Sequence, residues 1–215
     1  FANQTAGKAC DWWSGKWKED MDRAILTHQN AHRLSIEWSR IQPAPDRWDE
    51  QALDRYLEMV RTLRELNMTP LVTLHHFTNP LWLEEQGGWE NGASVGYFET
   101  FTRRVAEALK DYVNLWCSLN EPNGNAIQSY LLGEWPPGKK NLNAMFRAMV
   151  NMVKAHAAAY RTIHTLQPQA QVGMAINYRS FFPGKPWFPP DRWMARMLAR
   201  GLNDTFPRAA HTGVL

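Results

Sequence analysis

The segment Ser118-Leu119-Asn120-Glu121-Pro122 places a carboxylic acid beside an amide and directly before a proline. The preceding apolar run, 113–117, has the β-branched and aromatic content that is typical of a buried strand. Pro122 disfavours the right-handed helical region for Glu121 and cannot donate to a sheet ladder. We therefore predict that the strand stays extended up to Glu121 and ends there. A carboxylic acid in this position can act as a general acid or base, which makes Glu121 a candidate catalytic residue.

The side chains of Asn120 and Glu121 do not share a site if the strand is regular. Alternation would send neighbouring residues to opposite faces of the sheet. One of the two must therefore lie at a twisted strand end if both serve the same site. The competing interpretation of Glu121 is a solvated loop charge or the first residue of a helix.

A histidine pair, His75-His76, stands near the end of a second apolar segment, 70–77. Because neighbouring strand residues face apart, only one of the two imidazoles is expected to point into a site. A hydrogen-bonded structural histidine is the competing interpretation. A metal-binding pair is disfavoured, since the rings diverge and no third ligand is spaced to join them. We expect no metal and no cofactor.

Three charged residues, Arg33, Glu37 and Arg40, interrupt the first apolar segment, 32–41. Burial of such charges requires partners. Arg33 and Glu37 share a strand parity with two serines, and the lumen of a small barrel near an active site would accept this polar face. An ion-pair network that serves only stability is the alternative.

These residues must be positioned by a regular alternation of elements. The predicted strands are 32–41, 70–77, 113–121 and 171–178, and the predicted helices are 50–66, 95–112, 142–166 and 191–203. Such alternation indicates a parallel sheet. The longer connections follow the strands, as in the loops that form the active site of a (β/α)₈ barrel. With only four or five strands, residues 1–215 are expected to form one partial barrel domain, about the first half to two-thirds, cut at both ends.

Bulk composition excludes several classes of protein. A formal charge of +3 argues against a nucleic-acid binder, and no apolar run approaches the roughly 18 residues of a membrane span. Of the two cysteines, Cys10 and Cys117, the second lies in a predicted core strand, so we expect no disulfide framework and a reducing, cytoplasmic environment. The eleven tryptophans fill the core or, for a few, cover the C–H face of a sugar ring.

With these residues assembled, the chain resembles the amino-terminal half of a family 1 glycoside hydrolase, the family of β-glucosidases and β-galactosidases. The resemblance covers nearly the whole chain. It rests on four motifs in order, at 33–41, 73–77 with 80–83, 87–91 and 120–122. The fold that it implies is a (β/α)₈ barrel.

The resemblance implies a role for each matching residue. Glu121 matches the acid/base, and Asn120 matches the amide that contacts the sugar 2-hydroxyl. His76 matches the imidazole that binds a hydroxyl of the glycone, and Arg33 matches the arginine beside the nucleophile carboxylate. Substrate-binding residues of the family also lie near Asn177 and Tyr178.

The chain departs from the family pattern in two ways. Phe77 stands where many members carry tryptophan, and the Thr-Glu-Asn-Gly-like motif of the nucleophile is absent. Retaining hydrolysis needs a second carboxylate about 5 Å from the acid/base. We therefore expect a β-glucosidase-like retaining β-glycosidase whose nucleophile lies outside this chain, so that the isolated chain is inactive.

The expected substrate is a small β-glycoside or oligosaccharide, with no nucleic-acid or membrane partner. Two alternatives remain open at this point. One is an endo-acting barrel glycanase, and the other is a non-catalytic sugar-binding or decayed half-barrel. A downstream Glu-Asn-Gly motif in the flanking coding sequence would favour the enzyme, whereas its absence would favour the binding protein.

Overall fold

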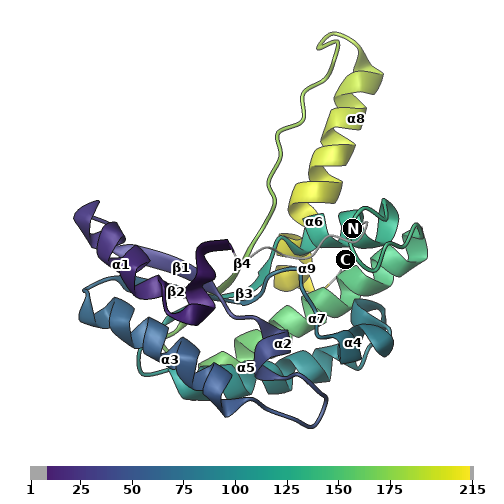
Figure 1. Ribbon diagram of the computed structural model, residues 1–215. Helices are drawn as coiled ribbons and strands as arrows, with labels where there is room; N and C mark the ends of the chain where they lie inside the picture. Colours follow the sequence, from purple (N-terminus) through teal and green to yellow (C-terminus); the bar gives the residue numbers. More distant parts are fainter. Residues whose placement is uncertain (1–8, 214–215) are drawn as a thin grey trace.

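A four-stranded parallel sheet forms the centre of the computed structural model, which describes residues 9–213. The strands lie in the order β1 (Ala31–Ser35), β2 (Thr69–His75), β3 (Leu115–Asn120) and β4 (Gln171–Ala175). Helices α3 (Glu50–Glu65), α5 (Ser94–Leu109) and α7 (Leu142–Leu166) connect successive strands and lie along one side of the sheet (Figure 1). The predicted α/β fold, part of a (β/α)₈ barrel, is confirmed.

The connecting helices begin where a side chain can satisfy their first amide groups. Asp49 Oδ1 accepts from the Ala52 amide at 2.9 Å and caps α3, while Asn141 Oδ1 accepts from the Ala144 amide at 3.0 Å and caps α7. After α3 the chain turns through Asn67, whose φ of 58° is left-handed. These are the bounds that the apolar periodicity predicted, within a few residues.

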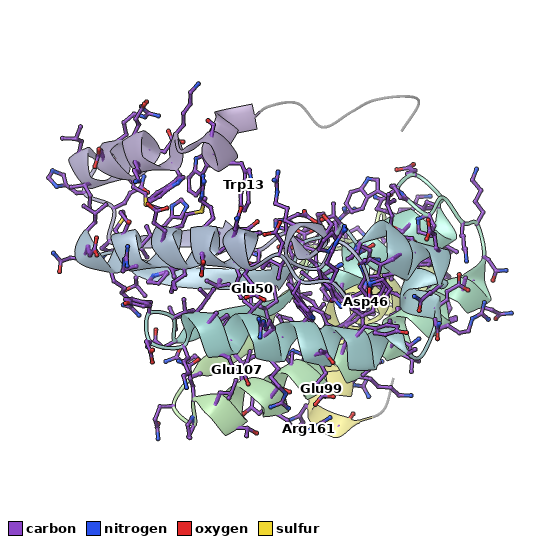
Figure 2. All side chains as sticks on the ribbon, turned by 60° about the horizontal axis from the view of Figure 1, so that its bottom comes forward. Trp13, Asp46, Glu50, Glu99, Glu107 and Arg161 are labelled. Atoms are coloured by element: carbon purple, nitrogen blue, oxygen red, sulfur yellow. The ribbon has the colours of Figure 1, made fainter. Side chains whose placement is uncertain are left out.

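The core lies between the sheet and these helices. The Trp38 ring stacks on Phe101, with ring centroids 4.9 Å apart, and meets the edge of Trp82 at 6.0 Å. Five tryptophans are buried in this core: Trp17, Trp38, Trp82, Trp89 and Trp116. Figure 2 shows polar side chains such as Glu107 and Arg161 on the helices that flank this core. Core filling therefore accounts for these five tryptophans.

All four predicted strands end earlier than expected. The second strand ends at His75, before His76 and Phe77, and the fourth ends at Ala175, before Asn177 and Tyr178. The first strand ends at Ser35, because Glu37 begins a short helix, α2 (Trp38–Ile41). The third strand ends at Asn120, and Pro122 starts helix α6 (Pro122–Ala126). Glu121 does avoid the right-handed region, as proline demands, but its backbone is left-handed, with φ 43° and ψ 53°, and not extended.

Several predicted loops and one predicted helix also differ. The connection 78–93 contains α4 (Leu81–Glu85) and the 3₁₀ turn η2 (Gly88–Glu90), and a π-helical turn η3 (Ile127–Leu131) follows α6. Near the N-terminus, η1 (Ala9–Ser14) and α1 (Trp17–Leu26) precede β1. The predicted helix 191–203 is α8 (Pro189–Ala199), continued through the π-helical turn η4 (Arg200–Asp204) into α9 (Thr205–Thr212). The segment leading to α8, and α8 itself, project away from the rest of the molecule (Figure 1).

Some further expectations concern cysteines, membranes and metals. Cys117 is a buried free thiol, whereas the side chain of Cys10 lies outside the described part of the chain. Within residues 9–213, no helix has the length and apolar content to cross a membrane. The same part of the chain holds no group of three or more metal-ligating His, Cys, Asp or Glu side chains.

Candidate active site

Arg33 joins the carboxyl-terminal halves of three strands. Its Nε donates to Thr73 Oγ1 on β2 at 2.8 Å, and its Nη2 donates to Asn120 Oδ1 on β3 at 2.7 Å. The Nη2 atom also lies 3.8 Å from Cys117 Sγ. All of these atoms lie on the side of the sheet opposite to the connecting helices. This side holds an open hollow of about 410 Å³ that is also lined by residues of β4.

A break in strand alternation brings Asn120 to this side. Cys117 and Asn120 both contact Arg33, although three residues of a regular strand would separate opposite faces. The pairing between β3 and β4 shifts its register between these two residues, which reverses the parity. Thr73 on β2 and His76, directly after β2, show the same three-residue spacing. The shift accounts for the side that Asn120 faces. Glu121 follows the end of β3 with a left-handed backbone, so the alternation of a regular strand no longer applies to this pair.

The two histidines take opposite sides of the sheet. His75 is 2% exposed and packs against the Trp89 ring, with centroids 5.1 Å apart, while its Nε2 bonds to Asn79 Oδ1 at 2.9 Å. Burial lowers the pKa of His75 to about 4. His76 is exposed on the side of Arg33, and its Nδ1 lies 2.8 Å from Ser35 Oγ. One histidine of the pair therefore points to the site and the other is structural.

The electrostatic surroundings of His76 place it between the candidate residues. Partial burial lowers the pKa of His76, and the positive charge of Arg33 lowers it further. The negative charges of Glu121 and Glu37 act in the opposite direction. Ser35 bonds to His76, and Arg33 bonds to Asn120, the residue before Glu121, so these groups lie together at the carboxyl ends of β1, β2 and β3.

Glu121 is held at the start of α6. Its amide donates to the Ala175 carbonyl on β4 at 2.7 Å, and its Oε2 accepts from Asn177 Nδ2 at 2.7 Å. A Cβ atom at Gly124 would lie 3.4 Å from the same Oε2, so a larger residue there would crowd the carboxylate. Asn177 therefore contacts the carboxylate of the candidate catalytic residue. Tyr178 is 74% exposed at the start of the projecting segment.

Only one of the three charges of the first segment, Arg33, points into the hollow. Glu37 accepts from Ser39 Oγ at 2.7 Å and from Thr78 Oγ1 at 2.8 Å, and Arg40 lies over the Trp13 ring at 4.3 Å. Among the residues whose side chains are described, these three charges do not pair with one another. This arrangement contradicts the ion-pair network that was the alternative interpretation.

Comparison with known proteins identifies the family of this chain. The family model described as glycosyl hydrolase family 1 matches residues 1–206. The chain belongs to glycosyl hydrolase family 1. Beta-glucosidase A of Thermotoga maritima is 34% identical over 180 residues, which is 83% of this chain but 40% of that protein. The chain thus spans less than half the length of this relative.

Solved structures of family 1 proteins share the fold. A beta-glycosidase from Pyrococcus horikoshii is 34% identical, with a TM-score of 0.83, and the match covers 90% of this chain and 45% of that one. A beta-glucosidase from Thermotoga maritima in complex with glucoimidazole is 32% identical, with a TM-score of 0.87, and the match covers 90% and 44%. The four strands of this family 1 chain are therefore part of a larger barrel in these neighbours.

One buried residue of this family 1 site was not predicted from the sequence. Asn123 is 1% exposed, and its Nδ2 donates to the carbonyls of Asn177 and Leu202, each at 2.9 Å. Its Oδ1 accepts from the Asn177 amide at 3.2 Å. Asn123 therefore fixes the backbone of the residue that holds the Glu121 carboxylate. The polar Asn-Gly-Asn run after Pro122 is the only sequence signal that pointed to it.

Proposed function

We propose that this chain carries the acid/base part of a retaining β-glycosidase that hydrolyses terminal β-linked sugars. In this mechanism Glu121 protonates the glycosidic oxygen and later deprotonates the hydrolytic water. The nucleophilic carboxylate belongs to a part of the barrel beyond these residues. We call the polypeptide that carries both carboxylates the complete enzyme.

Arg33 is the observation that carries this proposal. Its guanidinium donates to the neutral Thr73 and Asn120 side chains and lines the open hollow. Among the residues whose side chains are described, no carboxylate pairs with it. A closed barrel would bury this cation, and a buried cation needs an anion. A nucleophilic carboxylate facing Arg33 and Glu121 would supply that anion and also complete the catalytic pair.

The neighbours of Glu121 support a site that binds sugar hydroxyls. Asn120 and His76 lie on the same side as Arg33, and both offer hydrogen-bonding atoms to that side. Asn177 holds the Glu121 carboxylate and so orients the acid. In the proposed enzyme, Asn120 and His76 bind hydroxyl groups of the glycone, and Asn177 positions Glu121.

Substitution of Glu121 in the complete enzyme tests the acid/base role. We expect Glu121→Gln to slow hydrolysis of an unactivated β-disaccharide by about 100-fold or more, because general acid catalysis contributes that much. An activated dinitrophenyl β-glucoside needs no protonation, so its burst of released phenol should remain. Azide should restore turnover in Glu121→Gly, because it attacks the glycosyl-enzyme without a general base.

Glu134→Gln is the matched control, since Glu134 is an exposed glutamate in the loop after η3. This variant should hydrolyse both substrates at the wild-type rate. Disaccharide hydrolysis by Glu121→Gln within about threefold of wild type would show that Glu121 is not the acid/base. Formation of an α-glycosyl azide in place of the β-product would contradict the retaining mechanism.

A further inference from the structure

Glu37 occupies the junction of β1 with α2 and is fixed on both sides. Its amide donates to the hydroxyl of Tyr56 on α3 at 3.0 Å. One carboxylate oxygen, Oε1, accepts from the amide of Ser39 at 3.4 Å and from its hydroxyl at 2.7 Å, which caps the short helix. The second oxygen, Oε2, accepts from Thr78 Oγ1 at 2.8 Å. The carboxylate therefore links the end of β1 to the loop that follows β2.

Thr78 belongs to a tight turn whose backbone is strained. The Thr78 amide donates to the carbonyl of His76 at 2.9 Å, so that the turn closes around Phe77. The φ of Phe77 is 71°, which is unfavourable for a residue with a large side chain. Such strain persists only where the surroundings hold the backbone in place.

The turn is held by two residues of the β1 end and by one aromatic contact. Ser35 Oγ bonds to the His76 ring, and Glu37 bonds to the Thr78 hydroxyl. The Phe77 ring lies against Trp135, with centroids 4.8 Å apart. His76 thus precedes a strained turn that Glu37 ties to the end of the neighbouring strand.

We propose that Glu37 is a positioning residue, whose bond to Thr78 fixes the turn that aims His76 into the active site. This inference rests on the proposed function, in which His76 binds a glycone hydroxyl. A carboxylate suits the task because both of its oxygens accept hydrogen bonds, one for α2 and one for Thr78. A glutamine in its place has one accepting oxygen and no charge, so at most one of the two hydroxyls keeps its bond to an oxygen, and that bond is weaker.

Kinetics of the complete enzyme provide the first test. We expect Glu37→Gln and Thr78→Val each to raise KM for a β-glucoside about tenfold, with a smaller change in kcat, because His76 loses its orientation. Thr78→Ser keeps the hydroxyl and should stay near the wild-type KM. Glu65→Gln removes an exposed charge at the C-terminal end of α3 and is the control for loss of charge alone.

A His76→Ala background shows whether the effect passes through His76. There, Thr78→Val should add little to KM, because the group that it positions is gone. An undiminished tenfold effect in that background would overturn the inference. Equal KM values for Thr78→Val, Thr78→Ser and wild type would overturn it as well.

NMR of the histidine rings gives a readout that does not depend on activity. In spectra of the complete enzyme, the signal lost in His76→Ala identifies His76. Thr78→Val should shift that signal more than Thr78→Ser, and Glu37→Gln should lower the pKa of His76, since the Glu37 charge raises it. An unchanged His76 signal and titration in these variants would refute the positioning role even if activity were lost. The expected shifts in a protein that hydrolyses no glycoside would support the positioning role and refute the proposed function.

Discussion

His75 and His76 show how one strand end gives two identical residues different tasks. His75 is enclosed by Trp89 and Phe98 and bonded to Asn79, whereas His76 faces Arg33 and Glu121. Alternation along the strand already predicted that only one would reach a site. Alternation alone could not decide which one, because it does not fix where the strand ends, whereas the resemblance to the family selected His76.

The buried His75 should make stability depend on pH. Its folded-state pKa of about 4 lies below the ordinary value of 6.5, so between these values only the unfolded chain binds the proton. The stability is therefore fully present above pH 6.5 and is lost as the pH falls toward 4. We expect the free energy of unfolding to decrease by about 3 kcal/mol across this window because of His75.

Urea unfolding of the complete enzyme at several pH values measures this effect. His75→Gln, whose amide can still bond to Asn79, should lower stability at pH 7 but flatten the profile between pH 4 and 6.5. His211→Gln, an exposed histidine in α9, should keep the wild-type slope. A slope that survives in His75→Gln would assign the pH dependence to other groups.

At the scale of the elements, periodicity predicted the helices better than it predicted the strand ends. Helix α7 has the predicted bounds because an apolar stripe, the Asn141 cap and Pro168 agree locally. The end of β1 was misjudged because Trp38 and Ile41, three residues apart, fit a short helix as well as an apolar strand. The left-handed Glu121 depends on its bond to the Ala175 carbonyl of β4, a contact between residues 54 positions apart along the chain that no local pattern encodes.

In the candidate site, too, local patterns predicted the residues but not their arrangement. Glu121, Asn120, His76 and Arg33 could be selected from residue type and from their place at predicted strand ends. Their convergence required the register shift of β3 and the turn after β2, which arise from pairing between strands. The roles of these residues in catalysis stay predictions that the substitutions above can test.

Asn123 joins three elements, and its removal should affect both stability and activity. It bonds to the segment after β4 and to η4 while lying at the start of α6. Asn123→Ala leaves buried groups without partners, so we expect the free energy of unfolding to fall by about 3 kcal/mol. Asn177 should then lose its fixed backbone. At temperatures low enough for the variant to stay folded, the rate of hydrolysis of an unactivated disaccharide should fall by about tenfold or more.

Asn141→Ala is the matched control for this prediction. It removes a helix cap worth about 1 kcal/mol and makes no contact with Asn177 or Glu121. The temperature of thermal unfolding should therefore be lower for Asn123→Ala than for Asn141→Ala. Only Asn123→Ala should lose activity at low temperature. Equal activity losses in the two variants would show that Asn123 acts through general stability alone.

At the scale of the whole molecule, the four strands form an open sheet and not a closed barrel. Edge strands β1 and β4 each have one neighbour within the described chain, and the face with Arg33 is open. The projecting segment and α8 expose the rings of Phe182, Trp187 and Trp193. Open edges and exposed apolar groups promote association between chains.

We predict that residues 1–215, purified alone, associate through this surface and do not hydrolyse glycosides at an enzymatic rate. General acid catalysis by Glu121 contributes only about 10²–10⁴-fold, and glycosidase rates require far more. Size-exclusion chromatography should therefore show oligomers or aggregates, and p-nitrophenyl β-glucoside should stay intact. A monodisperse monomer whose turnover disappears in Glu121→Gln would place the second carboxylate within these residues.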